Sequence, residues 1–301
     1  MTRKVSKAGK VLFPDDGITK GELAAYYRAV AEVMLPHVRG RPIMMERFPD
    51  GIGREPIIQQ RAPDYFPPWV KRARVRRRSG GSITHAVIDN EDTLVFLADQ
   101  ACITPHVWLS RADRIERPDQ MIFDLDPPEG EFRLACHAAR TVRGVLDELG
   151  LRAFVKTTGG KGLHVEVPLN RRSSFDDVRA FARDVAALVV ARHPRQFTTE
   201  QRKPKRAGRV YLDMMRNAYG QTAVAPYAVR ARKGVPVATP LEWEELDDRR
   251  LTPARFTLRN VPRRVARAAD PWRDMERRAF ALGPARRRLA ALWKRSGEQA
   301  R

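Results

Sequence analysis

The sequence predicts an α+β fold, in which mixed or antiparallel central sheets are flanked by helices. Strand-like and helix-like apolar patterns are intermingled along the chain, without the regular alternation that marks a doubly wound parallel sheet. The segment "TTGGKGLHVEV", residues 157–167, indicates two strands joined by a glycine turn, which makes the pair antiparallel. Beyond Leu241 the chain is helical and rich in arginine, which predicts a C-terminal helical extension.

The N-terminal third of the chain begins with a predicted helix. Residues 19–38 have a plausible N-cap at Thr19 and apolar residues at helical spacing, a pattern that continues until Pro36. The elements predicted next are strands at residues 41–48 and 83–90 and a helix at residues 91–102.

The middle of the chain contains six predicted strands and two predicted helices. An amphipathic helix at residues 133–150 ends at Gly150, and a capped helix is expected at residues 174–193. The predicted strands are residues 103–110, 120–126, 152–158, 162–169, 209–215 and 222–230. We expect residues 1–250 to form one catalytic domain, with residues 251–301 as an arginine-rich helical extension packed on the same domain.

The charge balance is unusual. The 301 residues contain 57 Lys and Arg against 36 Asp and Glu, a net charge of +21. Such an excess favours a polyanionic partner, since basic side chains bound to phosphates release condensed counterions. The alternative is a protein from an arginine-rich proteome whose helices carry arginine without binding nucleic acid.

Other features exclude several protein classes. Cys102 and Cys136 lie in apolar segments without CxxC spacing, which argues against a disulfide framework and a zinc site. The N-terminus has no apolar segment typical of a secretory signal. The longest apolar stretch, residues 185–191, is too short to span a membrane. We therefore expect no membrane association and a cytoplasmic, nucleoid-associated protein.

The segment "IFDLD" places Asp124 and Asp126 on one face of a strand and Leu125 on the other. Two neighbouring carboxylates repel and are costly to desolvate unless a cation neutralises them, and oxygen ligands suit Mg²⁺ or Mn²⁺. Asp213 ends another apolar strand, and three converging aspartates could hold two divalent ions about 4 Å apart. The alternative is a set of solvated strand ends.

The glycine turn lies between these acids in the sequence. Its glycines allow backbone N–H groups to approach a phosphate, and Lys161 adds positive charge. It is not a Walker loop, because the spacing differs and a strand follows. His164 points away from the apolar face of that strand, beside Glu166, and is a candidate phosphate contact; a purely structural histidine is the alternative.

Two basic runs, residues 71–78 and 201–209, flank the predicted catalytic strands. We interpret both as contacts to a DNA backbone, with solvated loops as the alternative. The arginines of the C-terminal extension are interpreted as a charged helical face.

The residues above, taken in order, resemble the polymerase domain of bacterial ligase D, a branch of the archaeo-eukaryotic primase superfamily. The resemblance covers about residues 10 to 246 and rests on the following stretches: "KVLFP", "ITKGELAAYY", "MLPHVRGRP", "RFPDG", "PHVW", "FDLDPP", "TTGGKGLHVEVPL", "VYLDMMRNAYGQTAVAPYAVR" and "VPVATPLEWEEL". It implies a primase-polymerase fold. No ligase-like or nuclease-like sequence follows, so we expect a free-standing member.

The resemblance also implies roles for individual residues. Asp124, Asp126 and Asp213 correspond to the catalytic triad that holds two Mn²⁺ or Mg²⁺ ions. The implied nucleotide-binding residues are His106, Thr158, His164, Arg230 and Arg47, and the glycine turn described above adds Gly160 and Lys161 as candidates. Lys10 and Lys20 correspond to lysines that hold the 5′-phosphate of the downstream DNA strand.

Three positions depart from the family pattern. Ile57 and Ile58 stand where end-joining members carry two phenylalanines, whose stacking on a base is worth roughly 1–3 kcal/mol. Glu46 replaces a usual lysine beside Arg47, and Thr158 replaces a serine while keeping the hydroxyl. These changes leave the predicted catalytic residues intact and put the handling of the template in question.

The predicted function is template-directed nucleotidyl transfer that fills short gaps or extends ends in DNA repair. The implied partners are gapped or broken duplex DNA with a 5′-phosphate and NTP or dNTP, with a ribonucleotide preference. The end-binding protein Ku and a separate DNA ligase are possible further partners. The alternatives are a metal-dependent nuclease, a less well matched phosphatase, and a non-catalytic DNA end-binding protein.

Overall fold

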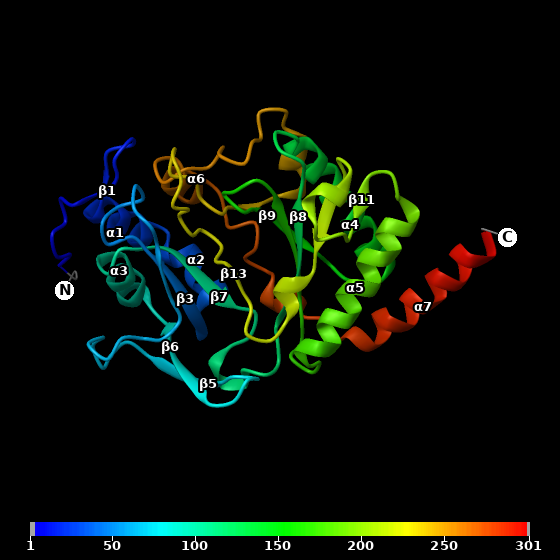
Figure 1. The fold of residues 1–301 in the computed structure, drawn as a ribbon, viewed down its shortest axis with the longest axis horizontal. Helices are drawn as coiled ribbons and strands as arrows, with labels where there is room; N and C mark the ends of the chain where they lie inside the picture. Colours follow the sequence, from blue (N-terminus) through cyan, green and yellow to red (C-terminus); the bar gives the residue numbers. More distant parts are fainter. Residues whose placement is uncertain (1–3, 300–301) are drawn as a thin grey trace.

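Two six-stranded sheets form the framework of the computed structural model, which describes residues 4–299 (Figure 1). The first sheet has the order β13-β7-β3-β6-β5, with β4 paired to β3, and the second has the order β11-β12-β8-β10-β9-β14. Every strand pair in them is antiparallel except β11 with β12. The predicted α+β class with largely antiparallel sheets is confirmed.

The elements have the following bounds. The first sheet contains β3 (Arg41–Arg47), β4 (Ile57–Gln59), β5 (Arg72–Arg76), β6 (Ser82–Ile88), β7 (Cys102–Trp108) and β13 (Thr222–Val224). The second contains β8 (Gln120–Asp126), β9 (Phe154–Thr157), β10 (Leu163–Pro168), β11 (Phe197–Thr198), β12 (Val210–Asp213) and β14 (Pro240–Leu241), and a separate ribbon pairs β1 (Val11–Phe13) with β2 (Ile18–Thr19). The helices are α1 (Lys20–Ala29), α2 (Ala31–Val38), α3 (Glu91–Asp99), α4 (Phe132–Glu148), α5 (Phe175–Arg192), α6 (Val261–Arg267) and α7 (Leu282–Gln299).

The helix predicted at residues 19–38 is two helices. Thr19 caps α1 as predicted, in a capping box with Glu22, but Val30 leaves helical geometry at φ −103° and ψ 1° and separates α1 from α2. Pro36 lies inside α2 and does not end it. Both helices pack beside the first sheet, where the hydroxyl of Tyr27 donates to the carbonyl of Ile103 at 2.6 Å.

The second sheet buries one face under α4 and α5 and turns the other toward the first sheet. Phe123 and Leu125 of β8 belong to the core cluster that the two helices complete. The side chains between them on β8 therefore point to the opposite face, as the period of two predicts. On that side Lys156 of β9 donates to the carbonyl of Val224 in β13, at 2.5 Å, which links the two sheets.

Several strand predictions need correction. The basic run at residues 71–78 contains the edge strand β5, paired with β6, and is not only a loop. The strand predicted at residues 222–230 stops at Val224, because Pro226 has no N–H to donate and Tyr227 adopts φ +62°. The short strands β1, β2, β4, β11 and β14 were not predicted, since two or three residues give no readable period.

The C-terminal segment packs along both sheets. Trp272 is fully buried, and its indole N–H donates to the carbonyl of Val155 at 3.1 Å. Leu282, Ala285 and Leu289 of α7 join the core cluster of the second sheet. The division of the chain into a catalytic domain, residues 1–250, and an extension, residues 251–301, stays a prediction. Residues 1–3 of the first part and 300–301 of the second lie outside the described residues.

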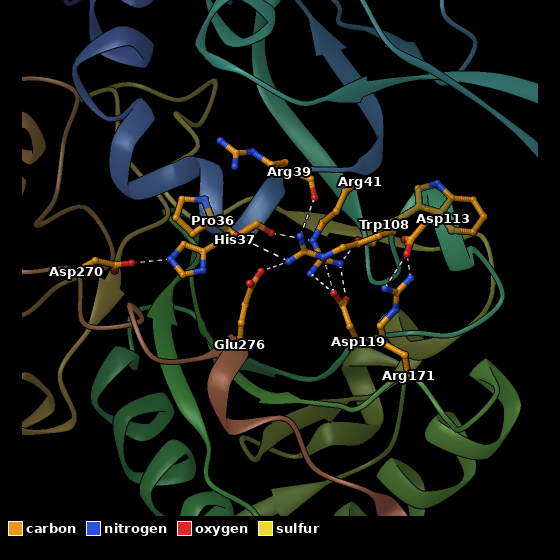
Figure 2. Close-up of polar contacts among 11 residues, drawn as sticks. Pro36, His37, Arg39, Arg41, Trp108, Asp113, Asp119, Arg171, Asp270 and Glu276 are labelled. Carbon is orange, nitrogen blue, oxygen red and sulfur yellow. Dashed lines mark hydrogen bonds and ion pairs between the residues drawn. The ribbon is translucent and has the colours of Figure 1, made fainter.

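Charged side chains join the sheets to this segment at the start of β8 (Figure 2). Buried Arg41 makes two hydrogen bonds to Asp119, at 2.6 and 2.9 Å, and Arg111 donates to the same carboxylate at 2.9 Å. Arg111 also pairs with Glu276. His37 contacts Asp270 at 2.6 Å, and the hydroxyl of Tyr227 donates to Asp270 at 2.7 Å. We call the six residues with charged or imidazole side chains among them the junction network: His37, Arg41, Arg111, Asp119, Asp270 and Glu276.

No helix within residues 4–299 is both long enough and apolar enough to cross a membrane.

Candidate active site

The register of the second sheet places charged side chains in one row. Asp213 of β12 lies opposite Asp124 of β8, and Asp124 lies opposite His164 of β10. His164 in turn lies opposite Lys156 of β9. Directly paired residues share a face of the sheet, so this row faces away from α4 and α5. Residues separated by up to 89 positions in sequence thus become neighbours.

This face borders a cleft of about 210 Å³ between the two sheets. Eight of the predicted site residues line it: His106, Asp124, Asp126, Thr158, Gly160, Lys161, His164 and Arg230. Arg216 and Arg232 also line the cleft, and the sequence analysis did not single them out. Their signal was available, because Arg216 follows the strand of Asp213 by three residues and Arg232 follows Arg230 by two.

Asp213 does not line the cleft, although it neighbours Asp124 in the sheet. Its Oδ1 accepts a hydrogen bond from the backbone N–H of Met215 at 2.7 Å. Within residues 4–299, no three His, Cys, Asp or Glu side chains are gathered closely enough to hold a metal ion as they stand. The three aspartates therefore lie on two neighbouring strands of the second sheet, without forming a closed ligand shell.

The electrostatics of the two cleft aspartates differ. Burial would raise the pKa of Asp124, but His164 at 3.6 Å and Arg216 at 3.5 Å outweigh it and lower that pKa. Burial raises the pKa of Asp126, and the negative charges of Asp124 and Asp213 raise it further. Asp126 forms no ion pair with a basic side chain of the described chain. Asp126 thus carries negative charge without a basic partner, and both acids present hard oxygen donors, which fit divalent cations such as Mg²⁺ or Mn²⁺.

The glycine turn forms one rim of the cleft. Thr158 Oγ1 donates to the carbonyl of Gly162 at 3.1 Å and accepts from the N–H of Gly160 at 3.2 Å. Gly159 adopts φ +61°, and a Cβ there would lie 2.7 Å from the side chain of Arg230. A Cβ at Gly162 would collide with the carbonyl of Leu125 in β8. The glycines therefore allow the turn to press against the acid strand and Arg230, while the Lys161 amine remains half-exposed, 3.5 Å from Glu129.

Arg230 enters the same cleft from the segment after β13. Its Nη1 donates to the carbonyl of Thr158 at 3.3 Å, whereas its Nε is buried and has no hydrogen-bond partner in the described part of the chain. Burial lowers the pKa of Arg230. A guanidinium with so few partners beside a glycine turn is suited to an anionic ligand.

A buried polar chain supports His164 from behind. His164 Nδ1 lies 3.4 Å from Glu166 Oε1, and the same oxygen lies 3.2 Å from the Lys156 amine. Burial would raise the pKa of Glu166, but Lys156 and His164 outweigh it and lower that pKa. The sequence analysis missed Lys156, although a lone lysine in an otherwise apolar strand was the available signal.

The other nucleotide-site predictions fall in two places. His106 lines the cleft, with Nε2 at 3.3 Å from Glu46 Oε2, and burial lowers its pKa. Glu46 therefore faces the histidine directly. Arg47 does not line the cleft, because its guanidinium donates to Gln59 at 2.6 Å and to the carbonyl of Gln100 at 2.8 Å.

The two N-terminal lysines lie close together, since the N–H of Lys20 donates to the carbonyl of Lys10 at 2.8 Å. The amine of Lys10 is half-exposed and lies 3.1 Å from Asp50. The amine of Lys20 is buried and contacts both Asp99 and Ser6 at 2.9 Å. Lys20 therefore also holds the N-terminal segment in place.

The surface features predicted to contact DNA are exposed in part. Ile57 and Ile58 of β4 are 48% and 56% exposed, so they are available to a ligand. Arg76, Arg77 and Arg78 of the first basic run border a surface groove, and Arg78 also pairs with Asp176 at 2.8 Å. In the second run, Arg206 lies over the ring of Tyr211 at 4.0 Å.

Comparison with known protein families identifies the family of this chain. Residues 19–272 match the family described as the LigD primase-polymerase domain. The chain belongs to this family. The resemblance inferred from the sequence is confirmed, and with it the class of DNA-directed nucleotidyltransferases to which these polymerase domains belong.

Curated relatives of this primase-polymerase are longer proteins. The LigD proteins of Mycolicibacterium smegmatis and Pseudomonas aeruginosa are each 35% identical to it, over 84% and 90% of its length. The bifunctional LigD protein of Bacillus subtilis is 31% identical over 89%. The aligned regions cover 34%, 32% and 43% of these relatives, so the chain spans less than half of their length.

Among solved structures, the chain is similar to the polymerase domain from Mycobacterium tuberculosis Ligase D in complex with DNA. The two share 35% sequence identity and superpose with a TM-score of 0.87. The match covers 93% of this chain and 99% of the other. The two-sheet architecture is therefore that of a LigD polymerase domain.

Proposed function

We propose that this protein is a template-directed nucleotidyltransferase that extends a DNA primer across short gaps or at broken ends. The observation that carries the proposal is that carboxylates and a guanidinium with an unpartnered nitrogen line the same cleft. Asp126 offers a carboxylate without a basic partner beside Asp124, and Arg230 offers a guanidinium whose buried Nε has no partner among residues 4–299. A nucleoside triphosphate bound with divalent cations satisfies both.

The three aspartates would hold the cations. Asp124 and Asp126 present carboxylates to the cleft, and Asp213 would join them from the neighbouring strand. Two Mg²⁺ or Mn²⁺ ions supply activation of a hydroxyl and neutralisation of phosphate charge when bound. The choice between these ions, and the count of two, belong to the proposal.

The remaining cleft residues would hold the nucleotide. Arg230, His164 and the backbone of Gly160 would bind the triphosphate, with Lys161 and Thr158 on the rim. His106 and, outside the cleft, Arg47 are proposed to contact the rest of the nucleotide. The 3′-hydroxyl of the primer then attacks the α-phosphorus, a new phosphodiester bond forms, and diphosphate leaves. A preference for ribonucleotides is the expectation that follows from the family.

The proposed nucleic acid is a gapped or broken duplex. Support comes from the similar polymerase domain in complex with DNA and from relatives named as non-homologous end joining proteins. Lys10 and Lys20 are proposed to hold the 5′-phosphate beyond the gap, and the runs 71–78 and 201–209 to contact the backbone. Ku and a separate DNA ligase are proposed as partners in the same repair event.

Primer extension tests the proposal. A gapped, 5′-phosphorylated duplex is incubated with Mn²⁺ and each labelled ribo- or deoxynucleotide, for the native chain and for Asp213→Ala. We expect extension by the native chain, none by the variant, and DNA binding by both. Shortened primers would indicate a nuclease, and binding without any new product a non-catalytic end-binding protein. Extension retained in Asp213→Ala would remove that residue from the metal site.

A further inference from the structure

The chain between Asp248 and Asp270 has one sign of charge. Residues 249–269 contain seven arginines and no aspartate or glutamate. Four of the arginines recur at intervals of four residues: Arg255, Arg259, Arg263 and Arg267. The sequence analysis interpreted the arginines of this segment as a charged helical face, but in the structure several of them line a groove.

The segment forms a groove of about 300 Å³ along α6, which we call the α6 groove; its lining is Arg255, Phe256, Asn260, Arg263, Arg264 and Arg267. Arg264 builds the wall, because its guanidinium donates to both carboxylate oxygens of Glu245, at 2.7 and 2.6 Å. The same guanidinium lies 4.7 Å from the centre of the Phe256 ring. Arg264 therefore covers one face of the ring, and the ring also packs against both large core clusters.

The other three arginines of the groove are free. Arg255, Arg263 and Arg267 are exposed, and none of their guanidinium groups forms an ion pair or hydrogen bond with a described residue. Arginines that hold this fold together are paired instead, as Arg192 is with both oxygens of Glu148. Three like charges around one groove repel each other unless an anion lies between them.

The α6 groove is joined to the candidate active site by one hairpin. Thr257 bridges to Pro236, and the N–H of Val237 donates to the carbonyl of Phe256 at 2.9 Å. The same hairpin carries Arg230 and Arg232, which line the cleft (α6 and this segment lie together in Figure 1). Lys233, at the turn of the hairpin, has a side chain that is 82% exposed, and its amine lies 3.6 Å from Asp15. Arginines therefore lie at both ends of this connection, Arg230 and Arg232 in the cleft and the α6 arginines in the groove.

We propose that the α6 groove binds the phosphodiester backbone of the nucleic acid strand that extends beyond the catalytic cleft. The inference rests on the proposed function, which places nucleic acid in the cleft. Arg263 and Arg267 lie one helical turn apart, about 6 Å along α6, and so can contact successive phosphates. The covered Phe256 ring favours contact with the backbone over contact with bases, so binding at this groove is independent of sequence.

A matched pair of double variants tests the groove. Arg263→Gln with Arg267→Gln removes two groove charges, and Arg183→Gln with Arg287→Gln removes two exposed charges elsewhere, on α5 and α7. The affinity for a labelled gapped duplex with a single-stranded overhang is measured at several salt concentrations, without nucleotide or metal. We expect the groove variant to bind on the order of tenfold more weakly, and its slope of log affinity against log salt to shrink by about 2. The control should keep the native slope within about half a unit.

Extension assays separate this inference from the proposed function. The groove variant should have a raised KM for the overhang duplex and the native kcat at saturating DNA, with an unchanged melting temperature. Equal losses in both double variants, or no loss in either, would overturn the groove and leave nucleotidyl transfer intact. Weaker binding of labelled nucleoside triphosphate by the groove variant, with DNA affinity unchanged, would also overturn it. A native chain that binds DNA but never extends a primer would refute the proposed function. The DNA affinities of the two double variants would still test whether the α6 groove binds DNA.

Discussion

The two ends of strand β8 carry aspartates in opposite circumstances. Just before the strand, Asp119 accepts hydrogen bonds from Arg41 and Arg111, so its charge is matched by two guanidiniums. At the other end, Asp126 has no basic partner within ion-pair distance in the described chain, and its neighbours Asp124 and Asp213 are themselves negative. The same residue type is therefore neutralised by protein at one end and left open at the other.

This contrast separates charge that holds the fold from charge that awaits a ligand. A buried ion pair is tolerated when both partners are satisfied, and breaking it is costly. Neighbouring carboxylates that repel each other lower the stability of the fold unless a cation binds between them, so their presence indicates a functional site. Arg230, with its unpartnered Nε, belongs with the open end of β8, and buried Arg41 belongs with the paired end.

The largest effect is expected at the open end. Asp126→Asn keeps the shape of the side chain and removes its charge, so nucleotide addition should fall about 10⁴-fold, which is about 5.4 kcal/mol of activation free energy. The fold should be at least as stable as the native one, because repulsion from Asp124 and Asp213 is relieved. Single-turnover extension and thermal melting check the two halves. A marked loss of stability would place Asp126 with the structural charges.

The reverse is expected at the paired end. Asp119→Ala leaves Arg41 buried beside no carboxylate, and the free energy of unfolding should fall by about 3 kcal/mol. Nucleotide addition per folded molecule should stay within a few-fold of native, because Asp119 and the cleft lie at opposite ends of β8. Denaturant unfolding and extension at low temperature measure these values. Full stability in this variant would erase the contrast between the two ends.

Glu166→Gln probes the support behind His164. The amide can donate as well as accept, so the contact at 3.4 Å no longer fixes His164 Nδ1, and Lys156 loses its carboxylate. We expect the KM for the nucleotide to rise about tenfold, which is about 1.4 kcal/mol, with kcat changed less than threefold. The matched control is Glu148→Gln, which breaks the surface pair with Arg192. A fall in kcat alone, without a change in KM, would contradict the positioning role.

The smallest effect concerns pH at the junction network. Burial would raise the pKa of Asp270, but hydrogen bonds from His37 and Tyr227 outweigh it and lower that pKa below its ordinary 3.8. The ionised carboxylate therefore stabilises the fold above pH 3.8, and this contribution is lost as the pH falls through the lowered pKa. Asp270→Asn should lower the melting temperature at pH 7 by a few degrees and converge with the native chain in strong acid. A constant difference at every pH would rule out this linkage.

Much of the candidate site was predictable because it depends on local backbone geometry. The period of two put Asp124 and Asp126 on one face of a strand. The glycines of the turn predicted that backbone N–H groups can approach a phosphate there. The caps of α1 and α5 followed from Thr19 and Ser174, each with its acidic partner three residues later. The ordered motifs resembled the polymerase domain of ligase D, and the match to that family confirms the resemblance.

Other features depended on long-range contacts. Val30, a buried residue that is not a helix breaker, splits the first predicted helix in two. Arg47 was grouped with the nucleotide site, yet Gln59 and Gln100 hold its guanidinium outside the cleft. The resemblance predicted that Lys20 holds a 5′-phosphate, and only the structure shows that Asp99 and Ser6 contact its buried amine.

The sequence by itself determined which faces of the strands carry acids, where the glycine turn lies, and that positive charge is in excess. Only the tertiary structure decided which charges are paired: Asp119 with Arg41, Asp124 with His164, and Arg263 with nothing in the described chain. The physical reason is that strand period and helix caps are set by neighbouring residues. Whether a charged side chain is paired depends on residues far along the sequence, which strand register and tertiary packing bring next to it.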